Sequence, residues 1–294
     1  MTTAAVVTPS GPRQRDWPRT ALAVWTTLCI LFLLIPIGFV IVHSLNGGNS
    51  FNIWKKFGGL TWYRKIWNDI PFRNTLLNSF KAAVGSTIIA LFIGAFAGVA
   101  VARRQGRWTK PFLALLFLIL VTPEIIDAVA LLGWFNSVIK GPFQNGLFGV
   151  RGGMLSLWVG HSLFSSAVVT LIVRARLDGL DESLEEAAAD LGATPARVFR
   201  QITLPLMTPA LAASGMLSLS FSLDNTIMSS FISGNASTYP VYLLGTVKSS
   251  TKPSAGAGAV VLFVATLLAA TATVIVLRRS GQSSSEIASN LAAG

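Results

Sequence analysis

Apolar residues dominate six stretches of the chain, each about as long as a helix that crosses a membrane. A bilayer core about 30 Å thick requires about 20 mostly apolar residues in one helix. The stretches that meet this requirement are 21–42, 82–102, 111–135, 154–173, 208–231 and 257–277. The pattern predicts an all-α membrane protein with six transmembrane helices in a domain over 20–279, between polar tails at 1–19 and 280–294.

The composition supports this prediction. Hydrophobic residues make up 52% of the 294 residues and charged residues only 12%, whereas a soluble domain carries about 25% charged residues. The composition therefore excludes an ordinary cytosolic enzyme and a disordered chain. The net charge of +11 arises from short basic clusters between apolar runs, a distribution typical of membrane orientation. We therefore expect a multi-pass protein of the inner or plasma membrane that contacts lipid and binds no nucleic acid.

The Lys and Arg residues also predict the orientation of the chain. Cytoplasmic loops of membrane proteins carry an excess of these residues, and short loops follow the rule best. The short loop Arg103–Lys110 holds four of them, and slightly more than half of the 23 basic residues fall on the same side as the N-terminus. Six spans then place both termini in the cytoplasm. On the other side, Thr61–Ile70 mixes aromatic and charged residues, which predicts a short amphipathic helix whose aromatic residues anchor it at the membrane surface.

Two further patterns are interpreted as structural. Gly94 and Gly98 form a G-x-x-x-G pair in the second apolar stretch, which lets two helices approach closely. Cys29, His43 and His161 lie in separate apolar segments. One cysteine permits no intrachain disulfide and no cysteine-based metal cage, so we predict no metal site and interpret both histidines as packing or interfacial residues.

The loop 174–201 is the one long polar segment on the predicted cytoplasmic side. It holds half of the twelve acidic residues. Asp181, or Ser183 in a capping box with Glu186, can cap a first helix. Gly192 can stop that helix with a positive φ, and Pro195 after Thr194 starts a second one. The loop therefore predicts a helix–glycine–helix hairpin with the small residues Ala187 and Ala188 on its face.

The same loop resembles a known family. Glu186-Ala187-Ala188, then Gly192, Ile202 and Leu204-Pro205 match the spacing of the E-A-A loop of ABC importer permeases with the type I fold. The resemblance implies that this loop is the coupling helix, which docks on a cytoplasmic ATPase subunit, with Glu186 as docking acid and Gly192 as the turn. The residues implied in coupling are Glu185, Glu186, Ala187, Ala188, Gly192 and Pro195.

Other segments resemble one subfamily, the C-type permeases for spermidine and putrescine. These segments are Thr122-Pro123-Glu124-Ile125, Ser222-Leu223-Asp224-Asn225, the following 229–234, and Tyr239-Pro240-Val241-Tyr242. The resemblance implies import of polyamines or a similar small cation. That subfamily often has a second acid where this chain has Asn225. Ferric iron, phosphonate, thiamine or another small organic solute is the alternative, because related permeases serve these solutes.

Three acids lie inside the apolar stretches: Glu124, Asp127 and Asp224. An ionisable residue at membrane depth costs about 2.5–3.5 kcal/mol on insertion scales and marks a candidate functional site. Glu124 and Asp127 share a helix face, and Pro123 interrupts the backbone hydrogen bonds just before them. One hypothesis is that all three line a polar passage for a cationic solute. The alternative is that Asp127 or Asp224 caps a helix or pairs with an Arg of a partner subunit.

The chain contains no G-x-x-x-x-G-K-[ST] motif, which is the loop that holds ATP phosphates. We therefore expect a non-catalytic subunit without a cofactor of its own, whose ATP and Mg²⁺ are bound by a separate ATPase. The resemblance implies a second permease subunit, two ATPase subunits and an external solute-binding protein as partners. A channel or gradient-driven carrier is the alternative of another class, and it needs no ATPase-docking loop. An intramembrane enzyme lacks support, because no catalytic pair or metal spacing is visible.

Overall fold

The computed structural model describes residues 17–48, 55–104, 106–139, 153–249 and 253–279, and regular structure within them is helical. Most of the two predicted tails, 1–16 and 280–294, lies outside the described residues. An isolated antiparallel bridge joins Asn46 to Phe57. The helices are α1 Trp17–Ser44, α2 Thr61–Asn68, α3 Ile70–Arg103, α4 Thr109–Val121, α5 Glu124–Ile139, α6 Met154–Asp178, α7 Ser183–Asp190, α8 Pro195–Val198, the π-helix η1 Phe199–Thr203, α9 Leu204–Asp224, α10 Ile227–Ile232, α11 Tyr239–Ser249 and α12 Pro253–Arg279.

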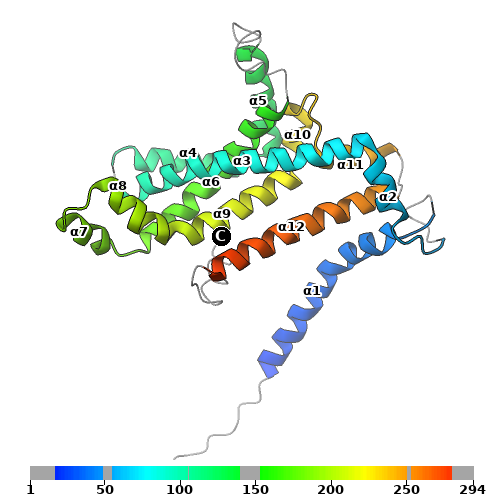
Figure 1. Ribbon diagram of the computed structural model, residues 1–294, viewed down its shortest axis with the longest axis horizontal. Helices are drawn as coiled ribbons and strands as arrows, with labels where there is room; N and C mark the ends of the chain where they lie inside the picture. The colour runs from blue at the N-terminus through cyan, green and yellow to red at the C-terminus, as the bar shows by residue number, and fades with distance from the viewer. Residues whose placement is uncertain (1–16, 49–54, 105, 140–152, 250–252, 280–294) are drawn as a thin grey trace, which may run out of the picture.

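The helices α3, α6 and α9 pack together and form the centre of the bundle (Figure 1). A Cβ atom on Gly94 would lie 2.6 Å from Cβ of Val169, and one on Gly98 would lie 2.7 Å from Cγ1 of Val173. Both contacts are too short for a real side chain. The close approach of α3 and α6 therefore requires the two glycines, and their predicted packing role is confirmed.

Five helical segments in the described chain are long and apolar enough to cross a membrane, and α4 with α5 make a sixth if the bent pair is one span. The third and fifth predicted spans, 111–135 and 208–231, are not continuous helices. The break in the third lies at Pro123, where the sequence predicts it, whereas the break in the fifth corrects the assignment of 208–231 as one helix. The third is bent by 105° between Val121 and Glu124. Thr122 is extended there, with φ −63° and ψ 129°, because a residue before proline avoids the helical region.

The fifth predicted span is interrupted after Asp224. Asn225 is extended, with φ −65° and ψ 106°, and α10 starts only at Ile227. Before α9, the chain passes through η1, where the N–H of Leu204 bonds to the carbonyl of Phe199. Such π-helical turns are rare and occur frequently at functional sites. The remaining spans agree with the prediction apart from their ends, since α3 begins at Ile70 and α6 continues to Asp178.

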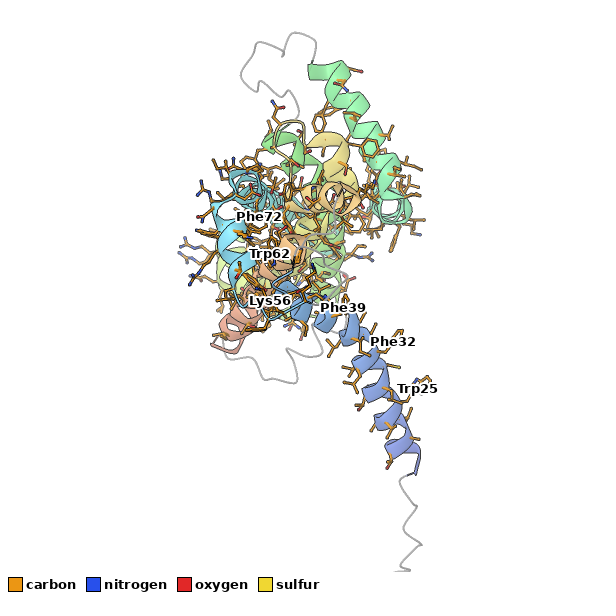
Figure 2. All side chains as sticks on the ribbon, turned by 90° about the vertical axis from the view of Figure 1, so that its right-hand side faces the viewer. Trp25, Phe32, Phe39, Lys56, Trp62 and Phe72 are labelled. Atoms are coloured by element: carbon orange, nitrogen blue, oxygen red, sulfur yellow. The ribbon has the colours of Figure 1, made fainter. Side chains whose placement is uncertain are left out.

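The helix α1 diverges from the rest of the molecule (Figures 1 and 2). Its most apolar window has a mean hydropathy of 2.5 and no residue buried inside this chain. Trp25, Phe32 and Phe39 project outward from it. An apolar helix exposed on all sides is stable in a lipid environment or against another membrane protein.

The short helix α2 is amphipathic, but its aromatic residues do not all face outward. Trp62 and Ile66 are buried in a cluster with Phe72, Leu76 and Tyr239. The indole N–H of Trp62 donates to the carbonyl of Asn46 at 2.7 Å. The expectation that Trp62 anchors the protein at the membrane surface is therefore wrong. Its ring instead packs α2 against α3, and its indole N–H bonds α2 to the segment after α1.

Candidate functional site: a polar hairpin and an intramembrane cavity

The loop between α6 and α9 folds into the predicted hairpin, formed by α7 and α8 (residues 183–198). Gly192 follows α7 with φ +81°, a conformation that side chains with a Cβ rarely adopt. The N–H of Ala193 bonds to the carbonyl of Ala188 at 3.0 Å and closes the helix end. Thr194 is extended and Pro195 is the first residue of α8. The helix break and the second helix start thus lie where the sequence predicts them.

The start of α7 differs in detail from the predicted capping box. Ser183 is the first residue of α7, and no side chain caps this helix at its N-cap residue Glu182. The carboxylate of Asp181 instead accepts the backbone N–H of Ser183 at 3.0 Å. This hydrogen bond holds the pKa of the Asp181 carboxyl below its usual range. The alternative prediction, a cap from Asp181, is the one that the geometry favours.

One surface of the hairpin is exposed to solvent. Glu186, Ala187 and Ala189 are exposed on α7. Leu184 is 52% exposed and Leu191 is 89% exposed. Leucine side chains so exposed beside small residues make a surface suited to a protein partner. We call Leu184, Glu186, Ala187, Ala189 and Leu191 the docking surface, as the candidate face for a partner protein.

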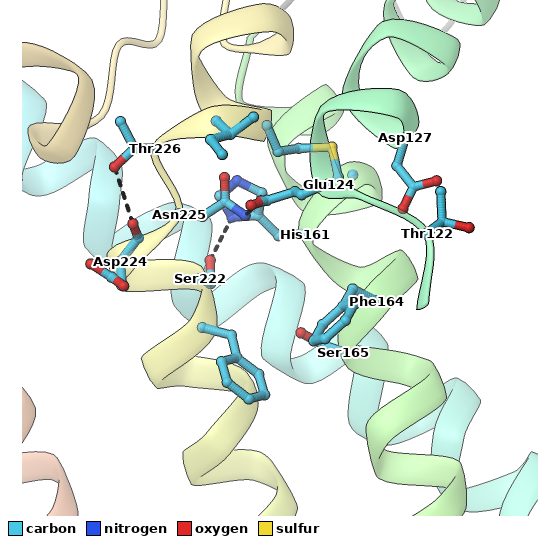
Figure 3. Close-up of a pocket in the computed structure, with 14 residues that line it drawn as sticks. Thr122, Glu124, Asp127, His161, Phe164, Ser165, Ser222, Asp224, Asn225 and Thr226 are labelled. Carbon is cyan, nitrogen blue, oxygen red and sulfur yellow. Dashed lines mark hydrogen bonds between the residues drawn. The ribbon is translucent and has the colours of Figure 1, made fainter. Parts of the chain in front are cut away.

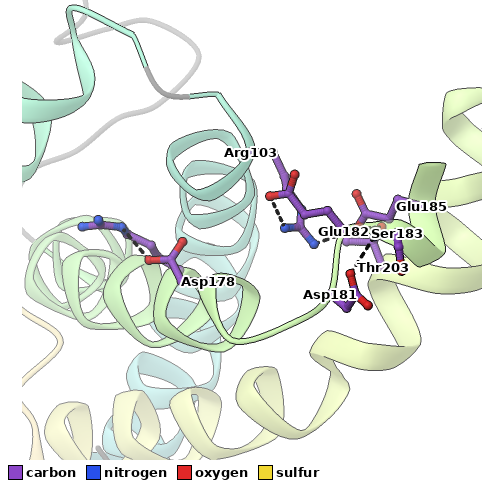
Figure 4. A network of polar contacts seen from close by, with 8 residues as sticks. Arg103, Asp178, Asp181, Glu182, Ser183, Glu185 and Thr203 are labelled. Carbon is purple, nitrogen blue, oxygen red and sulfur yellow. Dashed lines mark hydrogen bonds and ion pairs between the residues drawn. The ribbon is translucent and has the colours of Figure 1, made fainter.

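Glu185 does not belong to the docking surface. Its carboxylate contacts Arg103 at the end of α3, at 2.9 Å, and accepts the hydroxyl of Thr203, also at 2.9 Å (Figure 4). The structure therefore places this residue on the inner side of the hairpin. Ala188 is partly buried, while Gly192 and Pro195 are exposed at the turn.

The three acids of the apolar stretches line one cavity of about 460 Å³ (Figure 3). Glu124 and Asp127 are in the first turn of α5, directly after the proline break. Asp224 is the last residue of α9, directly before the second break. The walls also include His161, Phe164 and Phe221. The tertiary structure thus brings both helix breaks and all three predicted acids together.

A hydrogen bond joins the two helix breaks across this cavity. The amide Nδ2 of Asn225 donates to Oε1 of Glu124, and Oδ1 of Asn225 accepts the backbone N–H of Ser229 at 3.1 Å. Asn225 thereby connects α5 to the start of α10. In the view of Figure 3, Asp224 and Asp127 lie on opposite sides of this pair. Asp224 also lines a second cavity of about 670 Å³ between α9, α11 and α12.

His161 is a cavity residue that the sequence did not identify. Its Nδ1 lies 2.6 Å from Oγ of Ser222, and its Nε2 lies 3.0 Å from Oγ of Ser229. The ring therefore bridges α9 and α10 across their break. Ser86 on α3 also donates to Oγ of Ser222, at 3.1 Å. These partners are 61 and more residues away in sequence, so no local pattern marks them. In the described part of the chain, no group of three His, Cys, Asp or Glu residues is placed to hold a metal ion.

Comparisons with known proteins place this geometry in a family. Residues 90–283 match the family model described as binding-protein-dependent transport system inner membrane component. The spermidine/putrescine transport system permease protein PotC of Escherichia coli (strain K12) is 33% identical over 254 residues, which are 86% of this chain and 92% of that protein. The putrescine transport system permease protein PotI of the same strain is 31% identical over 231 residues, 77% of this chain and 79% of that protein.

A solved structure shares the fold. It is the bacterial alginate ABC transporter in complex with an alginate pentasaccharide-bound periplasmic protein, with a TM-score of 0.68 and 18% identity over 87% of this chain and 93% of the matched chain. The family model covers the hairpin, the cavity acid Asp224 and both helix breaks. The chain therefore belongs to the family of inner membrane components of binding-protein-dependent transport systems.

Proposed function

We propose that this chain is the permease subunit of an ABC importer and forms half of a translocation pathway for polyamines such as spermidine and putrescine. The observation that carries the proposal is the placement of Glu124, Asp127 and Asp224 on one cavity at two helix breaks. The names of the curated relatives, PotC and PotI, support the same solute class.

The lining of the cavity fits a short, flexible chain with several ammonium groups. Carboxylates accept charge-assisted hydrogen bonds from such groups. The rings of Phe164 and Phe221 offer faces to the ammonium groups and to the methylene segments between them. Non-helical backbone at membrane depth is tolerated where it lines a cavity, which accounts for the extended Thr122 and Asn225 at this place.

The docking surface of the hairpin provides the proposed link to the energy source. The chain lacks a phosphate-binding loop, so ATP and Mg²⁺ bind to a separate ATPase subunit in this proposal. Leu184 and Leu191 enter a cleft on that subunit, and Glu186 pairs with a cation there. A second permease subunit completes the pathway, and an external solute-binding protein delivers the solute. ATP-driven motion favours one of two access states, and the solute passes because it binds them differently.

The experiment is uptake of spermidine and putrescine by the complete importer in proteoliposomes, with Glu124→Gln, Asp127→Asn and Asp224→Asn. A hydrogen bond to a charged group contributes about 1.5–3 kcal/mol. Loss of one carboxylate that binds the polyamine therefore raises KM about tenfold or more. Asp178→Asn, which removes a charge from the exposed ion pair with Arg174 on α6, is the control and leaves KM unchanged.

Three results would contradict the proposal. Unchanged polyamine KM in all three variants would remove the direct role of the acids. Transport of a neutral or anionic solute in place of polyamines would reject the solute class. Transport by the purified chain without an ATPase would show a gradient-driven carrier or a channel instead.

A further inference from the structure

A polar cluster ties the inner side of the hairpin to the central helix of the bundle. Arg103 is the last residue of α3. Its Nη1 contacts Oε1 of Glu182 and its Nη2 contacts Oε1 of Glu185, both at 2.9 Å (Figure 4). The same oxygen of Glu185 accepts the hydroxyl of Thr203, the last residue of η1. We call Arg103, Glu185 and Thr203 the clamp. It joins three elements: α3, α7 and η1.

The two ion pairs of Arg103 differ in burial. The side chains of Arg103 and Glu185 are 15% and 23% exposed, whereas that of Glu182 is 63% exposed. Exposed ion pairs are screened by water and contribute little, while shielded ones are stronger and depend on geometry. Of the two ion pairs, the one between Arg103 and Glu185 therefore contributes more to holding the hairpin. Among the residues described, both ion pairs between different elements use Arg103, and the remaining pair, Arg174 with Asp178, is internal to α6.

A second contact reinforces the clamp. The ring of Phe96 on α3 stacks on that of Phe199 in η1, with centroids 6.2 Å apart. Phe96 and Arg103 are seven residues apart, so they lie on one face of α3. The last two turns of α3 thus face the hairpin and η1 with one aromatic and one charged contact.

The helix α3 also contacts Ser222, a residue that lines the cavity. Ser86 on α3 donates to Ser222, which in turn bonds to His161. Arg103 follows Ser86 by 17 positions, which is about 25 Å along the helix. Past its first turn α3 contains no proline, whereas the chain from the hairpin into α9 passes through the π-turn η1, Pro205 and Pro209. Two uninterrupted helices therefore run from the hairpin end of the bundle towards the cavity: α6, which carries His161 and leads into the hairpin after Asp178, and α3, whose contact with the hairpin is the clamp.

We propose that Arg103 and Glu185 are positioning residues that transmit displacement of the hairpin to α3 and so to the cavity, and that Glu185 holds the hairpin rather than docking the ATPase. The proposal rests on the proposed function, because the hairpin must first receive force from an ATPase. It separates two neighbouring acids by role. Glu186 faces the partner, and Glu185 faces the bundle.

The test measures spermidine taken up per ATP hydrolysed by the complete importer in proteoliposomes. Arg103→Lys keeps the charge but cannot reach both acids, and Glu185→Gln removes the ion pair at nearly constant shape. Both variants retain the ATPase subunit and hydrolyse ATP, while uptake per ATP falls about two- to thirtyfold, the range for interrupted coupling networks. Arg104→Lys, which changes the exposed neighbour of Arg103, and Asp178→Asn leave the ratio unchanged. The double variant with Arg103→Glu and Glu185→Arg, in which the two charges are exchanged, recovers much of the wild-type uptake per ATP.

The remaining outcomes can be distinguished from one another. If Glu185→Gln loses the ATPase subunit while Arg103→Lys keeps it, Glu185 is a docking residue. If both variants keep the wild-type ratio, the clamp transmits nothing. If both variants fail to assemble, the swap decides: recovered assembly and uptake support the clamp, and no recovery rejects it. If the wild-type chain does not co-purify with an ATPase subunit, or the wild-type complex does not take up spermidine, the proposed function itself is rejected before any variant is compared.

Discussion

At the residue scale, single backbone and side-chain positions set the geometry of both candidate sites. Gly192 turns the chain between α7 and α8 at φ +81°. Asn225 donates to Glu124 and accepts from the Ser229 backbone. An acid at 225 would lack the donor and would place like charges together. The amide at this position thus supplies a hydrogen-bond donor to the Glu124 side chain across the cavity.

Gly192→Ala is expected to disturb the hairpin turn and weaken binding of the ATPase subunit. A left-handed conformation costs an ordinary residue about 1–2 kcal/mol. Gly179 ends α6 at φ −91°, and a Cβ there meets only carbonyl oxygens at 3.7 Å or more, so Gly179→Ala is the matched control. The amount of ATPase that co-purifies with each variant measures the effect. Equal amounts for both variants would show that the turn geometry is not needed for docking.

At the element scale, two helix breaks and one close helix pair place the cavity. The breaks at Thr122-Pro123 and Asn225-Thr226 put charged residues at helix ends, where backbone groups are free to bind. The close approach of α3 and α6 brings Ser86 and His161 to the same side-chain network. The cavity thus depends on the two helix breaks, which are held in place by the tightly packed helices α3 and α6.

Gly94→Ala is expected to destabilise the protein. The added Cβ would lie 2.6 Å from Val169 and 2.9 Å from the carbonyl of Ser166, so the helices must separate. Overpacking of this kind costs about 1–3 kcal/mol. Gly133→Ala on α5 is the control, because its Cβ meets nothing within 4 Å and alanine favours a helix. Thermal unfolding in detergent compares the two. A Gly94→Ala protein as stable as Gly133→Ala would refute the close packing.

At the scale of the whole molecule, the polar ends of the bundle determine its placement in the membrane. The hairpin lies at one end of the bundle and α2 at the other (Figure 1). The predicted orientation puts the hairpin in the cytoplasm, because the short loop Arg103–Lys110 beside it is strongly basic.

Labelling with a membrane-impermeant maleimide tests this orientation. In a Cys29→Ala background, Asp190→Cys on the hairpin reacts only in inverted vesicles, and Lys56→Cys reacts only in intact cells. Both positions are exposed. The native Cys29 reacts in neither preparation, because it lies within the apolar helix α1 that is predicted to cross the membrane, where the impermeant reagent does not reach it. Labelling of both introduced cysteines from the same side would contradict the orientation.

The local features of the fold could be predicted from the sequence. Backbone groups in lipid must bond within their own helix, so a long apolar run by itself specifies a span. The turn at Gly192 and the break at Pro123 follow from the chemistry of those residues alone. The break after Asp224 could not be predicted, because asparagine and threonine occur both in helices and in turns. The span ends could not be predicted either.

The contacts between distant residues were decided by the tertiary structure. Arg103 and Glu185 are 82 residues apart, Glu124 and Asn225 are 101 apart, and each pair meets where two helices cross or end. The periodicity of a helix gives the face on which a side chain lies but not the helix opposite it. For this reason the amino-acid pattern was enough to place the spans, the hairpin and the three acids within the apolar stretches. Only the packing of α3, α6 and α9 decided that Trp62 is buried, that His161 bridges the broken helix, and that Glu185 faces inward while Glu186 faces out.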